Sequence, residues 1–246
     1  MTTIKTTICM LTLAFFSSGV EPSSLSVIVG AAAATPQSPA CTYTSRDGAE
    51  FWQSLSNSIK QWKDYTCDSE LESYSSKQRA HYRAKTHYKK DNQFRLEITS
   101  AGYKNGSVLV RTNSGKVRAQ GGLMLAYIKM DLEPNSRMLI LPNGRNAAQS
   151  DLPTLVDELA QRIARGHKCN MSATPVIEPG LDKKVIIVDI LKPDASGDVL
   201  SDRIFLDPGS HIPMRWDLFD NGKKISAAWF KNVRINAGLD DELFQL

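Results

Sequence analysis

The strongest folding signal in this chain is a period of two residues in its C-terminal stretch, Arg203 to Phe244. The stretch predicts three strands and a closing helical turn. In the last two strands, apolar side chains alternate with polar or turn-forming ones, so each has one apolar face. The apolar positions are Ile212, Met214, Trp216 and Leu218 on the second strand, and Ile225, Ala227, Trp229, Val233 and Ile235 on the third. Between the strands, Asp220-Asn221-Gly222 tolerates the positive φ angles of a tight hairpin turn. The hairpin therefore needs an extensive apolar partner.

Two helical stretches could supply that partner. An amphipathic helix is predicted over residues 49–63, with Asp47 and Glu50 forming a capping box. A second helix is predicted with Ser150 as its cap and an apolar stripe over residues 152–163. Further strands are predicted at 66–74, 81–88, 94–99, 106–110, around 117, within 123–132, and at 136–141, 170–177 and 183–191.

Taken together, these elements predict an α+β fold that is mainly β. The strands do not alternate with helices as in βαβ units, so the sheet should be antiparallel. We expect it to be strongly curved, with an apolar concave face covered by the two amphipathic helices. The space between sheet and helices is then either a packed core or a lipid pocket. The apolar pattern by itself favours the packed core.

The N-terminal residues resemble an export signal. Lys5 precedes a short apolar run at 8–16, and small residues at 31–34 suit cleavage. Neither this run nor the second one at 25–34 approaches the ~20 apolar residues that span a bilayer. We expect a signal peptide over residues 1–34, a flexible lead-in over 35–46 and a single domain over 47–246. An uncleaved anchor or a disordered tail is the alternative for the first segment.

The chain has four cysteines, whose number and spacing matter if the protein is exported. Cys9 lies inside the expected signal, which leaves an odd number of cysteines in an exported protein. The bridge expected first is Cys67–Cys169, because both residues lie next to predicted strands. Cys41 follows Ser38-Pro39-Ala40 and superficially resembles a lipidation site, but the neighbouring proline and the distance from the apolar run argue against lipid anchoring there.

Charge and motifs exclude several classes of function. The chain has 30 Lys and Arg against 26 Asp and Glu, a net charge of +4 that does not indicate nucleic-acid binding. Residues 77–118 nevertheless contain eleven basic residues against Asp91 and Glu97, a basic surface that would suit an anionic head group. A solvated strand face is the plainer explanation.

The sequence contains none of the common catalytic or cofactor motifs: no nucleophile elbow, no P-loop, no dinucleotide fingerprint and no HExxH zinc motif. His81 and His87 are six residues apart on one strand, about 20 Å at the rise of a strand, so they cannot share a metal ion. We therefore expect no enzyme activity, no metal and no cofactor. An exported hydrolase using carboxylates such as Asp217 is the least favoured class.

Two segments resemble the lipoprotein-localisation (Lol) carriers of the periplasm, the LolA/LolB-like superfamily. Residues 89–97, KKDNQFRLE, resemble the family's K-R-P-x-x-F-R-(aromatic)-(acid) segment. The end of the chain is similar too, from Ile204 to Asp207, through Ile212-Pro213, Asp217 and Gly222, to Leu239-Asp240 before Phe244. The resemblance covers most of residues 65–244.

This resemblance implies an unclosed β-barrel of about eleven antiparallel strands, covered by helices, that shields acyl chains in its concave face. By position it places Phe94 at the cavity, and Lys90 where the family has an arginine that helps to hold the lid. Arg95 is expected at the lid or a lipid head group. The expected cavity residues are Phe94, Leu96, Ile98, Met214, Trp216 and Trp229. We expect Phe94→Glu to weaken ligand binding by placing a charge in an apolar cavity.

The function expected from these features is a periplasmic, non-catalytic carrier or binding protein for lipid or lipoprotein acyl chains. Its partners would be the acyl chain and a membrane-bound donor or acceptor protein, with no nucleic acid, and the protein would be a monomer. The alternative is an envelope sensor or scaffold domain of the same fold that binds a protein partner. In that case the cavity would be vestigial.

Overall fold

A computed structural model describes residues 44–246 except 76–77, 101–103, 182 and 196. The expected signal peptide and most of the expected lead-in, with Cys9 and Cys41, lie outside the described residues. The division into signal, lead-in and domain therefore stays a prediction. Of the helices in the described part of the chain, none has the length and apolar character needed to cross a membrane.

Thirteen strands form one antiparallel sheet. They are β1 (Ser45–Asp47), β2 (Asp64–Ser75), β3 (Gln78–Lys89), β4 (Gln93–Ile98), β5 (Val108–Arg111), β6 (Val117–Gln120), β7 (Lys129–Leu132), β8 (Lys168–Ser172), β9 (Val176–Glu178), β10 (Lys183–Lys192), β11 (Val199–Leu206), β12 (Pro213–Asp220) and β13 (Lys223–Ile235). Their order across the sheet is β1-β8-β10-β11-β12-β13-β2-β3-β4-β5-β6-β7, with β9 paired to β10 outside this path. The two edges, β1 and β7, do not pair with each other, so the barrel is unclosed.

Two α-helices lie against the sheet, α1 (Ala49–Ile59) and α2 (Leu152–Ala164). Four short 3₁₀ helices complete the described elements: η1 (Leu123–Leu125), η2 (Arg137–Leu139), η3 (Ala147–Gln149) and η4 (Asp241–Phe244). The fold predicted from the sequence is confirmed: it is mainly β, curved, antiparallel, open at the edges and covered by two amphipathic helices.

The caps of the two helices differ from the prediction. Gly48, not Asp47, is the N-cap of α1, although Asp47 Oδ1 still accepts a hydrogen bond from the Ala49 N–H at 2.9 Å. The cap of α2 is Asp151 rather than Ser150, and its carboxylate accepts from the Thr154 N–H at 2.9 Å. Helix α1 also ends at Ile59, one turn earlier than expected.

Two predicted strands were wrong. Residues 136–141 contain the 3₁₀ helix η2, whose first turn is capped by the Ser136 hydroxyl, which accepts from the Met138 N–H. The strand predicted over residues 170–177 is two strands, β8 and β9. Pro175 lies between them, and proline has no N–H with which to continue a strand ladder.

The hairpin between β12 and β13 is confirmed, with positive φ at Asn221 (49°) and Gly222 (72°). The faces of its strands are not as predicted. Trp216 pairs with Ala228 and Arg215 pairs with Trp229, so the two tryptophans point to opposite faces of the sheet. An irregularity between Phe205 and Leu206 in the pairing of β11 with β12 also breaks the alternation near Met214.

Three clusters of buried apolar side chains hold the fold together. The largest packs both helices against the concave side of strands from β8 to β2, with Trp52, Leu159 and Ile204 fully buried. The second packs η2 and η3 against β3–β6 around Phe94 and Leu139. The third is small and lies on the convex face, where Val185, Ile187 and Phe205 are packed by Val176, Leu181 and Met214. The concave side therefore belongs to the first two clusters.

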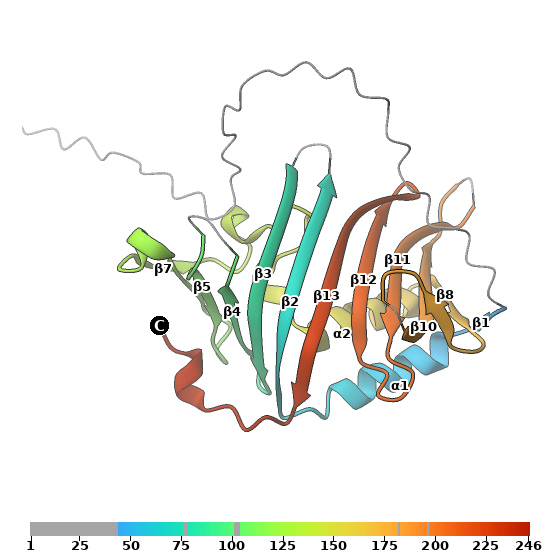
Figure 1. The fold of residues 1–246 in the computed structure, drawn as a ribbon, viewed down its shortest axis with the longest axis horizontal. Coiled ribbons are helices and arrows are strands. Elements are labelled where there is room, and N and C mark those ends of the chain that lie inside the picture. Colours follow the sequence, from blue (N-terminus) through green and yellow to red (C-terminus); the bar gives the residue numbers. More distant parts are fainter. Residues whose placement is uncertain (1–43, 76–77, 101–103, 182, 196) are drawn as a thin grey trace, which may run out of the picture.

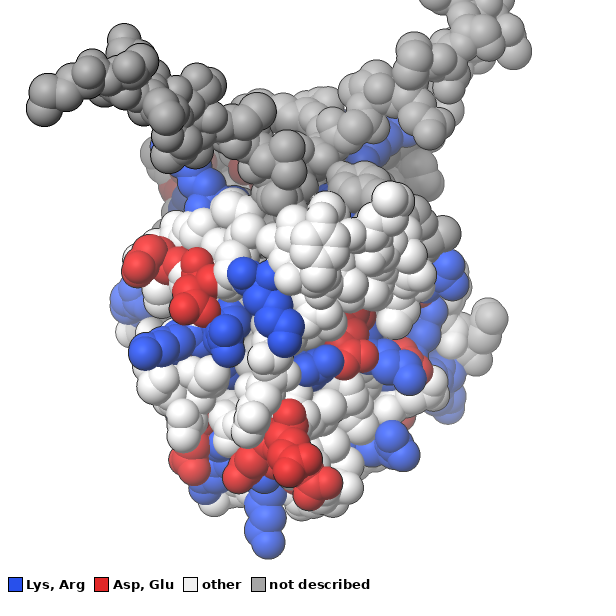
Figure 2. Space-filling model, turned by 90° about the vertical axis from the view of Figure 1, so that its left-hand side faces the viewer, with Lys and Arg blue, Asp and Glu red and all other residues white. Residues whose placement is uncertain are grey.

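The basic excess over residues 77–118 does not form a uniform positive surface. Acidic and basic side chains are interleaved on the face that contains the β7 edge (Figure 2). Several of the basic residues have acidic partners from other segments, as in Lys89 with Asp241 at 2.7 Å and Arg118 with Asp131 at 2.8 Å. Ion pairs of this kind neutralise part of the excess of positive charge in residues 77–118.

Candidate functional site

A pocket lies between the concave face of the sheet and the segment that covers it, here called the lid segment, residues 137–155. The pocket contains about 90 Å³ that the centres of water-sized spheres can occupy. One buried water needs only ~10–15 Å³ on that measure. The concave side therefore holds an open space in addition to the packed core that the sequence favoured.

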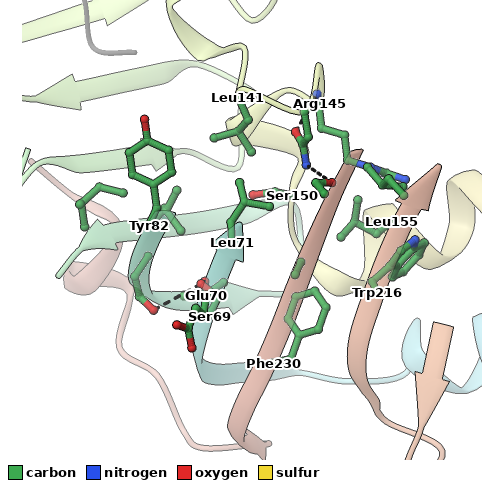
Figure 3. A pocket seen from close by; sticks show the side chains of 18 residues that line it. Ser69, Glu70, Leu71, Tyr82, Leu141, Arg145, Ser150, Leu155, Trp216 and Phe230 are labelled. Carbon is green, nitrogen blue, oxygen red and sulfur yellow. Dashed lines mark hydrogen bonds between the residues drawn. The ribbon is translucent and has the colours of Figure 1, made fainter. Parts of the chain in front are cut away.

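The floor of the pocket comes from five strands. Alternate residues of each strand point to the same face, and two or three such side chains from each of β2, β3, β4, β12 and β13 reach the pocket. These floor residues are Ser69, Leu71, Tyr82, Ala84, Thr86, Leu96, Ile98, Trp216, Leu218, Ser226, Ala228 and Phe230, and Glu70 between Ser69 and Leu71 also lines the pocket. Tyr82 and Trp216 lie toward opposite ends of the group, each with a polar atom at its tip (Figure 3).

The lid segment contributes the opposite wall. Its lining residues are Leu141, Asn143, Arg145, Ser150 and Leu155. Asn143 reaches across to the floor, where its Nδ2 donates to the Ser226 hydroxyl at 3.4 Å. Leu155 comes from the first turns of α2 and belongs to the main apolar cluster. The wall thus combines two leucines with the polar side chains of Asn143, Arg145 and Ser150.

Arg145 is the one cation among the residues that line this pocket. Its guanidinium donates to buried Asp202 at 3.2 Å and to Glu158 at 3.3 Å, and lies 5.4 Å from the centre of the Trp216 ring. Asp202 also accepts from the Trp216 indole at 3.0 Å and from Arg162 at 2.8 Å. The charge of Arg145 is therefore already matched by two carboxylates, and its main effect is to hold Trp216 in the pocket wall.

A second arginine, Arg111 on β5, anchors the lid segment to the sheet. Its Nη2 donates to Asp151 at 2.9 Å, its Nη1 to the Ala148 carbonyl, and its Nε to the Asn92 carbonyl at 2.8 Å. Asp151 is the N-cap of α2, so the same carboxylate starts the helix and binds the arginine. Tyr65 also holds this point, since its hydroxyl accepts from the Leu152 N–H at 2.9 Å. Both charges are almost completely buried.

A smaller apolar pocket lies next to the first. It is lined by Leu96, Ile98, Lys104, Ser107, Val108, Leu109, Ala119, Leu132, Met138 and Leu139. Leu96 and Ile98 line both pockets, so β4 forms a shared wall. The second pocket contains about 30 Å³ on the same measure. It extends the apolar surface of the concave face toward the β7 edge.

The structure brings three of the six expected cavity residues to the main pocket: Leu96, Ile98 and Trp216. Their contact with a ligand stays a prediction. Phe94 is fully buried in the second core cluster, where Arg111 lies 5.5 Å from its ring centre, and it lines neither pocket. The substitution Phe94→Glu would therefore disrupt packing instead of testing the cavity.

Met214 and Trp229 were wrongly assigned to the cavity. Met214 packs on the convex face against the cluster around Phe205. Trp229 lies beside Arg215, whose guanidinium is 5.7 Å from its ring centre and 4.9 Å from that of Phe205. The pocket instead receives Ser226, Ala228 and Phe230 from β13. The sequence shows a large side chain at 229, but only the pairing register shows which way it points.

Lys90 and Arg95 do not lie at the lid. Lys90 is exposed, and its backbone N–H donates to the Lys63 carbonyl at 2.7 Å. Arg95 donates to the carbonyl oxygens of Leu243 and Gln245 at 2.9 and 3.1 Å, and pairs with Glu97 at 2.5 Å. It therefore binds the C-terminal segment to β4. The arginine that anchors the lid segment is Arg111, at a position that no sequence pattern singled out.

The expected bridge between Cys67 and Cys169 is absent, and both thiols are free and buried. Cys67 lies on β2 and Cys169 on β8, five strand-to-strand steps apart in the sheet order. At about 4.8 Å a step that is roughly 24 Å along the sheet. A disulfide requires Cα atoms about 4.4–6.8 Å apart.

The lining of the main pocket contains neither histidine nor cysteine. Within the described ranges, no group of three or more His, Cys, Asp or Glu side chains could hold a metal ion. The two buried thiols are poor nucleophiles, because burial raises the pKa of each to about 12. Arg145, the cation of the main pocket, is bound to two carboxylates.

Comparisons with known proteins come from families and from solved structures. A family model described as Sporulation protein YdcC-like matches residues 40–117, fewer than half of the chain. No curated protein is significantly similar to the sequence.

The similar solved structures include a LolA superfamily protein from Nitrosomonas europaea, with 10% identity over 79% of this chain and 97% of that chain and a TM-score of 0.40. A putative outer membrane lipoprotein-sorting protein domain from Vibrio parahaemolyticus has 9% identity over 80% and 97%, with a TM-score of 0.40. The MucA/MucB complex of Pseudomonas aeruginosa has 14% identity over 80% and 60%, with a TM-score of 0.46. LolA-like and lipoprotein-sorting structures are thus among the neighbours, as the sequence resemblance predicted. At these identities and scores, they assign no ligand or partner to this chain.

Proposed function

We propose that this protein is a non-catalytic binding protein that takes an acyl chain into the pocket between the sheet and the lid segment. The observation that carries the proposal is the pocket itself: an unfilled space on the concave face whose lining is mostly aliphatic and aromatic. Transfer of apolar surface from water into such a space is favourable by about 25 cal/mol per Å². An acyl chain is the ligand that gains most from it.

The polar groups of the pocket fit this role. Ser69 and Thr86 bond to each other at 2.9 Å, and Asn143 bonds to Ser226, so these side chains satisfy one another when the pocket is empty. A long apolar ligand can therefore pass them without leaving a buried polar group unpaired. Arg145 is matched in the same way by Asp202 and Glu158.

The proposal is tested by a substitution that fills the pocket. Ala228 lies on the floor, and Ala228→Phe would place a ring in the space that the acyl chain is proposed to occupy. Ala164 is exposed at the end of α2 and does not line the pocket, so Ala164→Phe is the matched control. Both variants and the parent are titrated with a fluorescent fatty acid, after circular dichroism has confirmed that they fold.

The parent and Ala164→Phe should bind the probe with equal affinity, and Ala228→Phe should lose at least tenfold. Equal binding by all three folded proteins, or no binding by the parent, would reject the pocket as an acyl-chain site. Export to the periplasm and exchange of the ligand with a membrane-bound donor or acceptor belong to the same proposal. Comparing the chain with and without residues 1–34 in cell fractions tests the export.

A second candidate function, binding of a protein partner, is favoured by one observation. The loop around η1 exposes Leu123, Met124 and Tyr127, of which Met124 is 88% accessible. It lies beside β7, which is an edge of the sheet among the strands of the described residues. Exposed apolar side chains next to a free strand edge are typical of contact surfaces.

A photo-reactive amino acid at position 127 tests this candidate in living cells. A cross-link to one protein from position 127, but none from exposed position 113 in the turn after β5, would support it. The cross-link should also weaken in a Met124→Ser background. Equal labelling from both positions would reject the candidate.

A further inference from the structure

Strand β7 is the last strand in the order of the sheet, and one of its sides has no strand beside it among the described residues (Figure 1). Its pairing with β6 shows which backbone groups lie on that side. The Gly121 N–H donates to the Ile128 carbonyl at 3.1 Å, and the next pair in the register is Gln120 with Lys129. Successive residues of an antiparallel strand direct their N–H and C=O groups to alternate sides. The backbone groups of Lys129 and Asp131 therefore point away from β6, toward the open side.

The side chains of this edge carry one charge of each sign. Lys129 and Asp131 are exposed on the convex side, and Asp131 is 81% accessible although Arg118 of β6 lies 2.8 Å away. Met130 and Leu132 face the concave side and pack against the second core cluster. Charged side chains on an edge usually prevent its pairing with another chain. Opposite charges two residues apart, however, can match those of a second copy.

One antiparallel register matches them. With Met130 opposite Met130 of a second copy, each Lys129 lies opposite an Asp131, and the two residues can exchange both backbone hydrogen bonds. The two-fold symmetry repeats this pair on the other side of Met130. A shift by two residues in either direction places Lys129 opposite Lys129, or Asp131 opposite Asp131, and like charges directly opposite are destabilising. A shift by one residue would bring no outward-pointing backbone group opposite another.

The same register brings apolar side chains together. On the concave side, Leu132 would lie opposite Ile128 of the second copy, and Leu132 also lines the smaller pocket. Leu123, Met124 and Tyr127 are exposed beside this edge, and a second chain paired along β7 would reduce their exposure. Exposed apolar side chains that gather in one place are typical of interfaces.

From this arrangement we infer that the β7 edge binds a second copy of this chain, in antiparallel two-fold pairing centred on Met130. The two sheets become one continuous sheet, and the concave faces of the two copies adjoin at their smaller pockets. In place of the monomer expected from the sequence, the chain forms a symmetric dimer. The inference rests on the second candidate function, a protein partner at this edge, and names that partner.

The experiment exchanges the two charges. The full chain is compared with Lys129→Asp, with Asp131→Lys and with the double variant that carries both substitutions. Lys223→Asp is the matched control, because Lys223 is exposed on β13, inside the sheet, and its substitution changes the net charge equally. Sedimentation velocity over a series of concentrations measures the dimerisation constant, after circular dichroism has confirmed folding.

The parent, the control and the double variant should dimerise alike. Each single variant should dimerise about tenfold more weakly, because like charges replace both ion pairs of the interface. A mixture of Lys129→Asp with Asp131→Lys should recover the dimer, since one chain then has two acids and the other two bases at these positions. Recovery on mixing distinguishes loss of pairing from loss of folding.

Disulfide formation tests the register. The two copies of residue 130 would form a pair without hydrogen bonds, with Cα atoms ~4.5 Å apart, which is within the range of a disulfide. Met130→Cys should therefore give a 130–130 linkage under oxidising conditions, identified by peptide mass. Leu132→Cys should not link to itself, because it lies two residues from the symmetry axis.

The inference is overturned if the parent is monomeric at every concentration and Met130→Cys gives no 130–130 linkage, or if all charge variants dimerise equally well. If position 127 then still cross-links to another protein, the second candidate function stands with a different partner. If positions 127 and 113 are also labelled equally, the second candidate function and the inference both fail.

Discussion

Arg111 is the residue whose loss should affect this fold most through charge. Its guanidinium and the Asp151 carboxylate are both buried, and Arg111→Met would leave the Asp151 carboxylate buried without its ionic partner. Removal of one member of a buried pair typically lowers the free energy of unfolding by ~3–5 kcal/mol. We expect a loss of that order in urea denaturation.

The control for this prediction is on the neighbouring strand. Arg118 pairs with Asp131 at 2.8 Å, but the two side chains are 42% and 81% exposed. Such surface pairs contribute only ~0.2–1 kcal/mol. Similar losses in Arg118→Met and Arg111→Met would contradict the anchoring role of Arg111.

The two tryptophans of the C-terminal hairpin should report differently on a ligand. Trp216 lines the pocket, whereas Trp229 lies on the convex face beside Arg215. A bound acyl chain should change the fluorescence of Trp216 by altering the polarity around its ring. We expect Trp216→Phe to remove most of the ligand-induced change in intrinsic fluorescence and Trp229→Phe to preserve it. The reverse result would mean that the strand faces are exchanged.

The two buried cysteines should be inert in the folded protein. Burial raises the pKa of the Cys67 and Cys169 thiols to about 12, so the reactive thiolate is almost absent at pH 8. Iodoacetamide should label neither residue under native conditions and both in urea, as read from peptide masses. Rapid labelling of the native protein, or a Cys67–Cys169 peptide pair under non-reducing conditions, would contradict the structure.

Sequence patterns identified only some of the pocket residues, and individual residues show why. Periodicity identifies which residues share a face, but one irregularity in pairing reverses the faces beyond it. Such an irregularity explains the error at Met214. Trp229 was misassigned for another reason: alternation does not show which face of its strand meets the core, and the register pairs Trp229 with Arg215, not with Trp216. Arg145 and Arg111 gave no signal, because nothing in a sequence shows that an arginine will meet a carboxylate 40 or more residues away.

At the scale of elements, β9 should make stability depend on pH. Glu178 on β9 is buried against the convex face, and desolvation raises its pKa even though Arg215 lies 3.8 Å away. A raised pKa means that the native state binds the proton more tightly than the unfolded state. The free energy of unfolding therefore falls as pH rises from the ordinary glutamate pKa through the raised one.

Glu178→Gln removes this dependence. The variant should be more stable than the parent at pH 7.5 and indistinguishable from it at pH 4, where both side chains are neutral. Urea denaturation at the two pH values measures the difference, with Glu133→Gln in an exposed loop as the control. An equal difference at both pH values would exclude titration of Glu178 as its cause.

Elements with strong local signals were predicted well. The turn at Asn221 and Gly222 needs positive φ, and both helices have apolar stripes that only a covered face explains. Residues 136–141 lacked such a signal: their short apolar run, 138–141, suits a short strand as well as a 3₁₀ turn. Tertiary packing of Leu139 into the cluster around Phe94 decided between them.

At the scale of the whole molecule, the lid segment should be the least stable part of the concave side. Its backbone hydrogen bonds before α2 are local, as from the Leu141 N–H to the Arg145 carbonyl at 2.8 Å and from Gly144 to Leu141. Amides of residues 137–149 should therefore exchange with deuterium faster than those of β2, β3 and β13. A bound ligand should slow them most, as measured by mass spectrometry. Uniform exchange with or without a lipid would contradict the lid role.

The overall architecture followed from the sequence because it depends on averages over many residues: strand period, two helical stripes and the absence of βαβ units. The open pocket did not, because it depends on small differences in volume. Ala84, Ser226 and Ala228 leave space where larger side chains would have filled it. The alternation of apolar and polar residues predicts which of these side chains face the concave side. It does not predict that the lid segment leaves a space above them.

The contacts of Arg111 have one consequence for how a ligand reaches the pocket. They bind the lid segment at Ala148 and Asp151, at the start of α2, where Tyr65 also holds it. Arg145 also holds the segment, through Asp202 of β11 at 3.2 Å and Glu158 of α2 at 3.3 Å. The turn around Asn143 is bound more weakly, since its hydrogen bond to Ser226 of β13 is 3.4 Å long. Separation of this turn from β13 would break that hydrogen bond and leave the contacts of both arginines in place, so an acyl chain that enters the pocket would do so beside Ser226.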